Sequence, residues 1–173
     1  AGVTALARAA FADADETSVY LQDIDACAAA GLMTGTGKNE FSPGRPMTRA
    51  MLVTVLWRMA GEPNAGVSTF ADVLPGGWYE KAVAWANTRG LVSGTGAGSF
   101  SPDAPITREQ LIAILWRYAG SPQPAGSLSA FSDGAQTSAY AQTAMAWAVE
   151  TGLIGGSNGR LLPASGATRA QTA

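Results

Sequence analysis

The sequence predicts an all-α protein made of three tandem helix-loop-helix modules. The first observation is a repeat, because a Phe-x-Asp motif, a Gly-Leu pair, a glycine-rich turn and a Thr-Arg pair follow one another three times. The second is that apolar residues recur at helical spacing on both sides of that turn. The third is length: in a chain of 173 residues, three units of about 60 residues would each be marginal alone, so the modules are expected to share a core.

Copy two shows the repeat most clearly. Its landmarks are Phe70-Ala71-Asp72, Gly90-Leu91, Phe100-Ser101-Pro102 and Thr107-Arg108, and those of copy one lie 59 residues earlier. Copy three starts at Phe131, lacks one loop residue and stops five residues after Thr168, so most of its second helix is missing. We place the modules at residues 11–63, 70–122 and 131–173, with short linkers rich in proline and glycine between them.

The first predicted helix of each copy carries an aromatic residue near its start and ends at a glycine. In copy two, Trp78 and Trp85 share one face, and Gly90 then stops the helix as a C-terminal glycine does. Copy three repeats this pattern before Gly152, and copy one repeats it more weakly before Gly31. We expect Trp85 to lie in the core and Trp78 to be available for a ligand.

The second predicted helix of each copy starts at a threonine. Thr107 can cap the first turn while Gln110 reaches back to it, and the apolar stripe from Leu111 to Leu115 continues the helix. In copy one Met51 stands where the capping glutamine would be, which makes that start weaker.

Residues 1–10 precede the first module. Val3, Leu6 and Ala10 are spaced as on one face of a helix, which predicts a short helix packed on the bundle near the gap left by the third long helix. Deleting these residues is expected to lower the melting temperature.

Composition excludes several classes of function. Hydrophobic residues make up 47% and charged residues 14%, which favours a folded chain, and no apolar run approaches the roughly 20 residues that span a bilayer. A net charge of −2 without a dense basic run argues against nucleic-acid binding. There is no histidine, and Cys27 is the only cysteine, so we expect no catalysis, no metal and no cofactor.

The order of these motifs, three times over, resembles that of S-layer homology modules of bacterial surface proteins. The resemblance covers residues 11–173 and implies three modules with pseudo-threefold symmetry around a helical bundle, with ligand grooves between neighbours. It also implies that an exported protein is attached non-covalently at the bacterial cell surface to secondary cell-wall polysaccharide, often one bearing pyruvate ketals.

A pyruvylated sugar presents a carboxylate beside hydroxyls, so its site needs a directional cation, hydroxyl acceptors, open backbone amides and an aromatic wall. The arginine of the family motif maps onto Arg49, Arg108 and Arg169, which follow the capping threonines at helix N-termini that also favour anions. The alternative is that these arginines form surface ion pairs or hold adjoining modules together.

Three other sets of residues complete the predicted ligand site. The motif aspartates either accept from sugar hydroxyls or cap the following turn; they are Asp13, Asp72 and Asp133. The candidate wall residues are Trp78, Tyr20 and Tyr140. The glycines either leave backbone amides open to a ligand or serve turn geometry alone; they are Gly35, Gly94 and Gly156.

Copy three departs most from the pattern, because Leu161 replaces the aromatic residue of Phe-Ser-Pro, and we expect its groove to be degenerate. The rival function is a protein-binding or self-assembling scaffold of a surface layer, with other surface proteins as partners. The threefold recurrence of arginine and aspartate favours repeated small-ligand sites over one extended protein surface.

Overall fold

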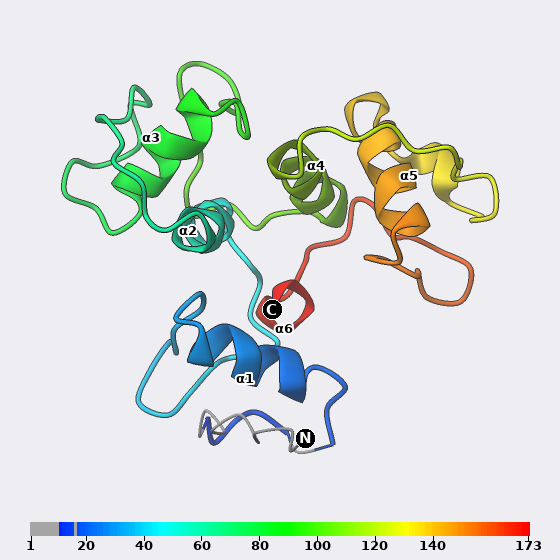
Figure 1. Cartoon of the computed structure of the whole chain (residues 1–173), viewed down its shortest axis with the longest axis horizontal. Coiled ribbons are helices and arrows are strands. Elements are labelled where there is room, and N and C mark those ends of the chain that lie inside the picture. Colours follow the sequence, from blue (N-terminus) through cyan, green and yellow to red (C-terminus); the bar gives the residue numbers. More distant parts are fainter. Residues whose placement is uncertain (1–10, 16) are drawn as a thin grey trace, which may run out of the picture.

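A computed structural model describes residues 11–15 and 17–173 as a helical protein with three lobes around a common centre (Figure 1). Its α-helices are α1 (Leu21–Ala29), α2 (Arg49–Met59), α3 (Glu80–Thr88), α4 (Arg108–Tyr118), α5 (Gln142–Glu150) and α6 (Arg169–Thr172). Two 3-10 helices, η1 (Gly134–Gln136) and η2 (Ala139–Ala141), precede α5. No element in the described ranges is a β-strand, which confirms the all-α class. The helix predicted within residues 1–10 lies outside the described residues.

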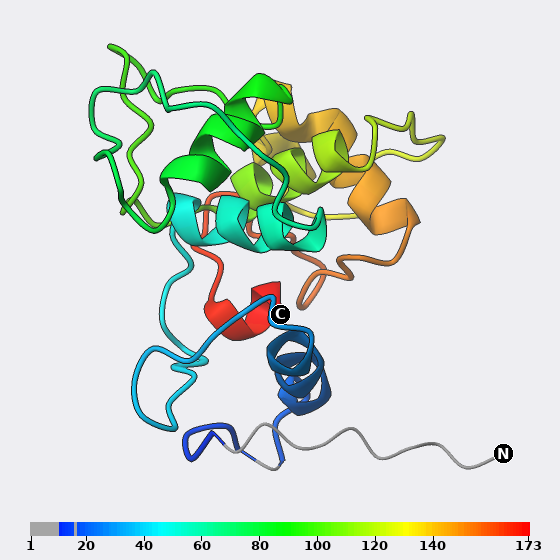
Figure 2. The same cartoon turned by 60° about the vertical axis from the view of Figure 1, so that its left-hand side comes forward.

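The lobes do not coincide with the sequence copies. The second helix of copy one, α2, packs against α3 of copy two, and α4 of copy two packs against α5 of copy three. The short α6 lies beside α1 of copy one (Figures 1 and 2), where the Cys27 thiol donates to the carbonyl of Ala173 at 3.0 Å. Each copy therefore gives its second helix to the next copy, and the third returns to the first.

A closed ring of backbone hydrogen bonds marks the centre of this arrangement. The amide of Met47 donates to the carbonyl of Ala167, that of Ala167 to Ile106, and that of Ile106 to Met47, at 2.8, 3.0 and 2.8 Å. All three residues are buried. Because one residue from each copy takes part, the ring fixes the pseudo-threefold relation of the copies.

The helix starts follow the sequence signals closely. Thr107 caps α4 together with Gln110 in a reciprocal capping box, and Thr168 does the same for α6. The cap of α2 is a threonine alone, as expected from Met51. Helix α3 starts later than its apolar pattern, at Glu80, so Trp78 lies in the preceding turn while Trp85 is buried. Among the described residues no helix has the length and apolar character that crossing a membrane requires.

Candidate functional site

Two of the three motif arginines are buried between copies. Arg49 donates from Nε to the carbonyl of Phe100 at 2.8 Å and from Nη2 to that of Ser93 at 3.0 Å. Arg169 makes the same pair of bonds to copy one, with Phe41 at 2.8 Å and Thr34 at 2.7 Å. Their exposed fractions are only 7% and 5%. The reading that these arginines hold adjoining modules together thus has direct support in the contacts.

Each buried guanidinium also lies over an aromatic ring. The Cζ atom of Arg49 is 4.6 Å from the ring centre of Phe100, and that of Arg169 is 4.5 Å from that of Phe41. Burial lowers the pKa of both arginines, but an arginine stays charged near neutral pH. Within the described chain, Nη1 of each has no hydrogen-bond partner, so one nitrogen of each cation remains for a ligand.

The expectation that the long helices offer their first amides to an anion is wrong. The Arg49 amide donates to Ala104 at 3.1 Å, the Ala50 amide to Pro102 at 3.0 Å, and the Met51 amide to the Thr48 hydroxyl at 3.2 Å. The equivalent amides of α4 and α6 are occupied in the same way by carbonyls of the next copy and by the capping threonines. These helix starts join the copies together.

The motif aspartates each clamp a turn. The two carboxylate oxygens of Asp72 accept from the amides of Phe100 and Ser101, both at 2.7 Å, and Ser101 has a left-handed φ of 58°. Asp13 and Asp133 do the same in their copies. The Phe100 amide bond is the main cause that lowers the pKa of Asp72 below its ordinary value. The turn-capping alternative is therefore realised in the fold, and acceptance from a sugar hydroxyl stays a prediction.

The three predicted glycines occupy one equivalent position that requires the absence of a side chain. A Cβ on Gly94 would lie 2.7 Å from the Ser99 carbonyl oxygen and 3.0 Å from the Phe70 ring. Gly35 and Gly156 meet the corresponding atoms of their own copies. Turn geometry thus explains the glycines. In the part of the chain that the structure describes, however, the amides of Ser93 and Gly94 donate to no protein acceptor, which leaves them open to a ligand.

Two grooves between copies gather six of the twelve predicted ligand residues, with Gly35, Trp78 and Arg169 in one and Arg49, Gly94 and Tyr140 in the other. Groove A is a cavity of about 240 Å³ lined by Thr34, Gly35, Thr36, Arg45, Met47, Met51, Arg58, Trp78, Arg169 and neighbours. Groove B is a cavity of about 420 Å³ lined by Arg49, Val92, Ser93, Gly94, Thr95, Gln110, Ala113, Ile114, Arg117 and Tyr140. Each groove draws its lining from three successive copies, and none of its described lining residues is an aspartate or a glutamate.

Aromatic side chains stand at the same place in both grooves. Trp78 in groove A is 59% exposed, and Tyr140 in groove B is 51% exposed. The Tyr140 hydroxyl donates to Oε1 of Glu109 at 3.2 Å, and burial together with this carboxylate raises the pKa of Tyr140 to about 12. The expectation for Tyr20 is wrong in register: Tyr20 is the N-cap of α1, as Tyr79 is of α3, so the counterpart of Trp78 is Val19.

The sequence analysis missed three arginines of these grooves. Arg58 and Arg117 follow tryptophan in the Leu-Trp-Arg segment of α2 and α4, and each donates to a carbonyl of its own copy, Leu32 at 3.0 Å and Leu91 at 3.1 Å. Recurrence of Leu-Trp-Arg at a 59-residue spacing was the signal that could have found them. Arg45 belongs to copy one alone and gave no such signal.

The third inter-copy cavity, groove C, is different in character. It measures about 260 Å³ and is lined by Asp23, Arg108, Leu111, Ile112, Leu115, Leu153, Ile154, Ala167, Gln171, Thr172 and Ala173. Arg108 donates from Nε to Leu161 at 2.9 Å, but a leucine stands where the other two arginines have a phenylalanine ring. Groove C is thus mainly apolar, and no tyrosine or tryptophan is among its described lining residues.

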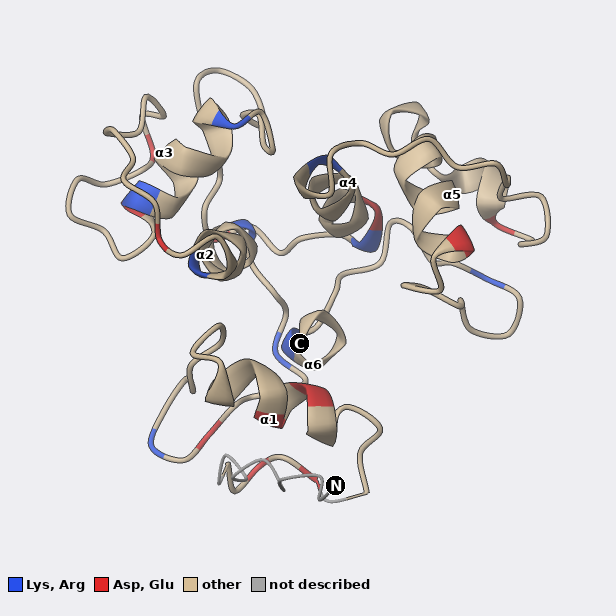
Figure 3. Cartoon of the chain, in the orientation of Figure 1, with Lys and Arg blue, Asp and Glu red and all other residues tan. Residues whose placement is uncertain are grey.

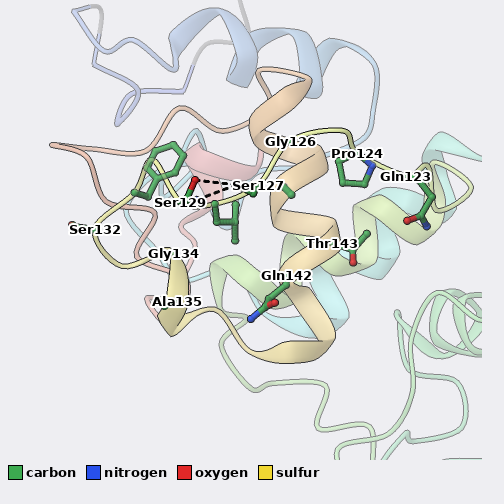
Figure 4. Close-up of a pocket in the computed structure, with 13 residues that line it drawn as sticks. Gln123, Pro124, Gly126, Ser127, Ser129, Ser132, Gly134, Ala135, Gln142 and Thr143 are labelled. Atoms are coloured by element: carbon green, nitrogen blue, oxygen red, sulfur yellow. Dashed lines mark hydrogen bonds between the residues drawn. The ribbon is translucent and has the colours of Figure 1, made fainter.

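A larger cavity of about 600 Å³ lies away from the predicted residues, between the linker before copy three and α5 (Figure 4). Uncharged side chains such as Gln123, Ser127, Gln142 and Thr143 line it. None of its described lining residues is charged, whereas grooves A and B contain arginines, so these two grooves remain the candidate site. No cluster of three or more potential metal ligands occurs among the described residues.

Comparison with known proteins agrees with the fold and the repeat. The family model described as the S-layer homology domain matches residues 10–50, 69–112 and 130–173. The surface-layer 125 kDa protein of Lysinibacillus sphaericus is 28% identical over 84% of this chain and 12% of its own length. An endoglucanase of Bacillus sp. (strain KSM-635) is 31% identical over 94% of this chain and 18% of its own length. The chain therefore spans less than a fifth of these curated relatives.

Proposed function

Because the chain belongs to the S-layer homology domain family, we propose that it binds secondary cell-wall polysaccharide in grooves A and B and thereby attaches the protein that carries it to the wall. The protein is associated with the cell surface and cell wall, as its S-layer relatives indicate. The matched modules cover about three quarters of the chain and are non-catalytic. The catalytic names among the relatives belong to proteins many times longer than the match.

One observation carries the proposal. Each of the two grooves brings guanidinium groups from two different copies to an exposed aromatic side chain, with no carboxylate in the lining. In groove B these are Arg49, Arg117 and Tyr140. Such a surface attracts an anion and offers a flat wall to a sugar ring.

The polar groups of groove B match a pyruvate ketal in number and kind. The Nη1 atom of Arg49 and the remaining nitrogens of Arg117 can donate to the ketal carboxylate. The open amides of Ser93 and Gly94 and the side chain of Gln110 can bond sugar hydroxyls. The ligand we propose is therefore an anionic, pyruvylated unit of the polysaccharide.

The experiment is sedimentation of the purified chain with isolated cell walls, before and after selective extraction of the secondary polymer. We expect binding before extraction and none after it, whereas a protein-binding scaffold would be indifferent to extraction. Arg117→Ala and Arg58→Ala are expected to weaken binding. Arg89→Ala is the matched control, because Arg89 is exposed at the end of α3 and lines neither groove. Equal binding to extracted walls would refute the proposal.

A further inference from the structure

We infer that groove A selects a sugar unit bearing two negative charges, either a phosphate monoester or two carboxylates, and that Arg45 is the residue that determines this selectivity. The inference rests on the proposed function and adds the charge of the ligand. It follows from a difference between two grooves that are otherwise built alike.

Arg45 is positioned by the joint between copies one and three. Its backbone carbonyl accepts from the Arg169 amide at 2.9 Å, so the two residues are neighbours across that joint. The Arg45 side chain is exposed and lines groove A together with Arg58 and Arg169. Figure 3 shows the resulting basic segments beside α6, near the middle of the molecule.

The equivalent joints carry no cation at this position. The carbonyl that accepts from the Arg49 amide at groove B belongs to Ala104, and the one that accepts from the Arg108 amide belongs to Ser165. Groove A thus holds three arginines in its lining, whereas groove B holds two. Since groove A is also the smaller cavity, its positive charge is the more concentrated.

The described lining of groove A contains no negative charge to offset its three arginines. No described lining residue of the groove is acidic. Asp13 lies close enough to act electrostatically on Arg169, but its carboxylate oxygens are both engaged with the backbone amides of Phe41 and Ser42. Besides burial, the charge of Arg45 lowers the pKa of Arg169, as expected of two cations that repel each other.

An anion that binds between these arginines offsets the repulsion between their charges and is attracted by all three guanidinium groups. With one negative charge, two guanidinium groups suffice, as in groove B. A phosphate monoester carries about −1.5 to −2 charges near pH 7, and two carboxylates carry −2, so a third cation adds affinity mainly for such ligands. Arg45 is exposed, so its contribution is modest, at about fivefold in affinity.

The test is an NMR titration that observes the grooves separately. The Trp78 indole N–H and the Gly35 amide report on groove A, and the Gly94 amide reports on groove B. The probes are a methyl hexoside with one 4,6-pyruvate ketal, the same glycoside with an added carboxymethyl group, and a hexose 6-phosphate. Comparison of the last two distinguishes the carboxylate source of the second charge from the phosphate source.

In the wild type we expect the dianionic probes to bind groove A about fivefold more tightly than groove B. Arg45→Ala should remove this preference, with less than a twofold change for the monoanionic ketal, and Arg45→Lys should retain it. Ala104→Arg should create the preference in groove B, a gain that misfolding cannot produce. A preference that survives Arg45→Ala, or that is missing from the wild type while the ketal glycoside still binds, would overturn the inference. If the ketal glycoside binds neither groove, the proposed function itself fails.

Discussion

Replacement of Arg49 by alanine is expected to destabilise the whole chain, and not only to weaken wall binding. The guanidinium joins copy one to copy two through the carbonyls of Phe100 and Ser93, and it lies on the Phe100 ring. Its removal leaves two carbonyls without their donors at the joint between copies. Of the alternatives that the sequence left open, the contacts of Arg49 thus support the one in which this arginine holds adjoining modules together.

The size of the effect follows from the contacts that are lost. The net contribution of a buried hydrogen bond from a charged group to stability is about 1.5 to 3 kcal/mol. A partly desolvated cation over an aromatic ring contributes about 1 kcal/mol. Groove B admits water to the freed carbonyls, so we take the lower end for each bond. The free energy of unfolding should then fall by about 3 to 4 kcal/mol, which for a chain of this size lowers the melting temperature by about 6 to 16 °C.

Thermal and urea unfolding of Arg49→Ala measure this directly, with Arg117→Ala as the matched control. Arg117 lines the same groove but makes one described hydrogen bond, at 3.1 Å and within its own copy, so it should cost about 1 kcal/mol or less. Arg49→Lys keeps the charge but cannot make the two-nitrogen contact, and should fall between the two. If Arg49→Ala unfolds at the wild-type temperature, the assignment of Arg49 as the joint between copies is refuted.

Three further predictions concern the turns and groove B. Gly94→Ala should lower the free energy of unfolding by about 1 to 3 kcal/mol because its Cβ would lie 2.7 Å from a carbonyl oxygen, whereas Gly66→Ala, in open space, should be neutral in the same urea titration. Folding lowers the pKa values of the motif aspartates, so the stability that they contribute is complete above the unfolded pKa of about 3.9 and is lost as pH falls through the lowered values. Acid unfolding followed by circular dichroism should therefore start below about pH 4. A transition at about pH 5 to 6 would contradict this prediction. Tyr140→Phe should lower the free energy of unfolding by about 1 kcal/mol, because it removes the hydrogen bond to Glu109. Since the pKa of Tyr140 is about 12, the affinity of the wild type for the glycan should not change between pH 7 and 10 through ionisation of this phenol.

Local signals predicted the elements and part of the candidate site. The pattern around Thr107 and Gln110 predicted a capped helix, and the structure has that capping box, while Met51 correctly marked the weaker start of α2. A turn cap was one of the two alternatives for the Phe-x-Asp motif, and Asp72 clamps such a turn. The capping box joins residues three positions apart, and the Asp72 clamp joins residues 28 and 29 positions apart but within one copy, so the repeated motifs are sufficient to find both.

The sequence could not show which copy the second helix of each repeat packs against, because the repeat is the same whether that helix packs on its own copy or on the next one. The sequence therefore did not reveal that Arg49 reaches Phe100, 51 residues away, or that Arg169 reaches Phe41, 128 residues away. The register of the first helix, by contrast, could be predicted from the sequence, because the 59-residue spacing places Val19, and not Tyr20, at the position of Trp78, and the N-cap positions agree. Arg45 occurs once, so repetition could not identify it.

The exchange of helices between copies couples ligand binding to folding. Groove A exists only when copy three has docked on copy one, since Arg169 supplies one wall and the residue 34–36 loop supplies another. A ligand that binds there stabilises the closed ring by RT ln(1 + [L]/Kd), and a concentration 100 times Kd contributes about 2.7 kcal/mol. This gain acts on the joint between copies three and one, where α6 has four residues in contrast to the eleven of α2 and of α4. Occupancy of groove A should therefore protect the amides of α6 and α1 from hydrogen exchange more than occupancy of groove B does, and equal protection by both grooves would contradict this coupling.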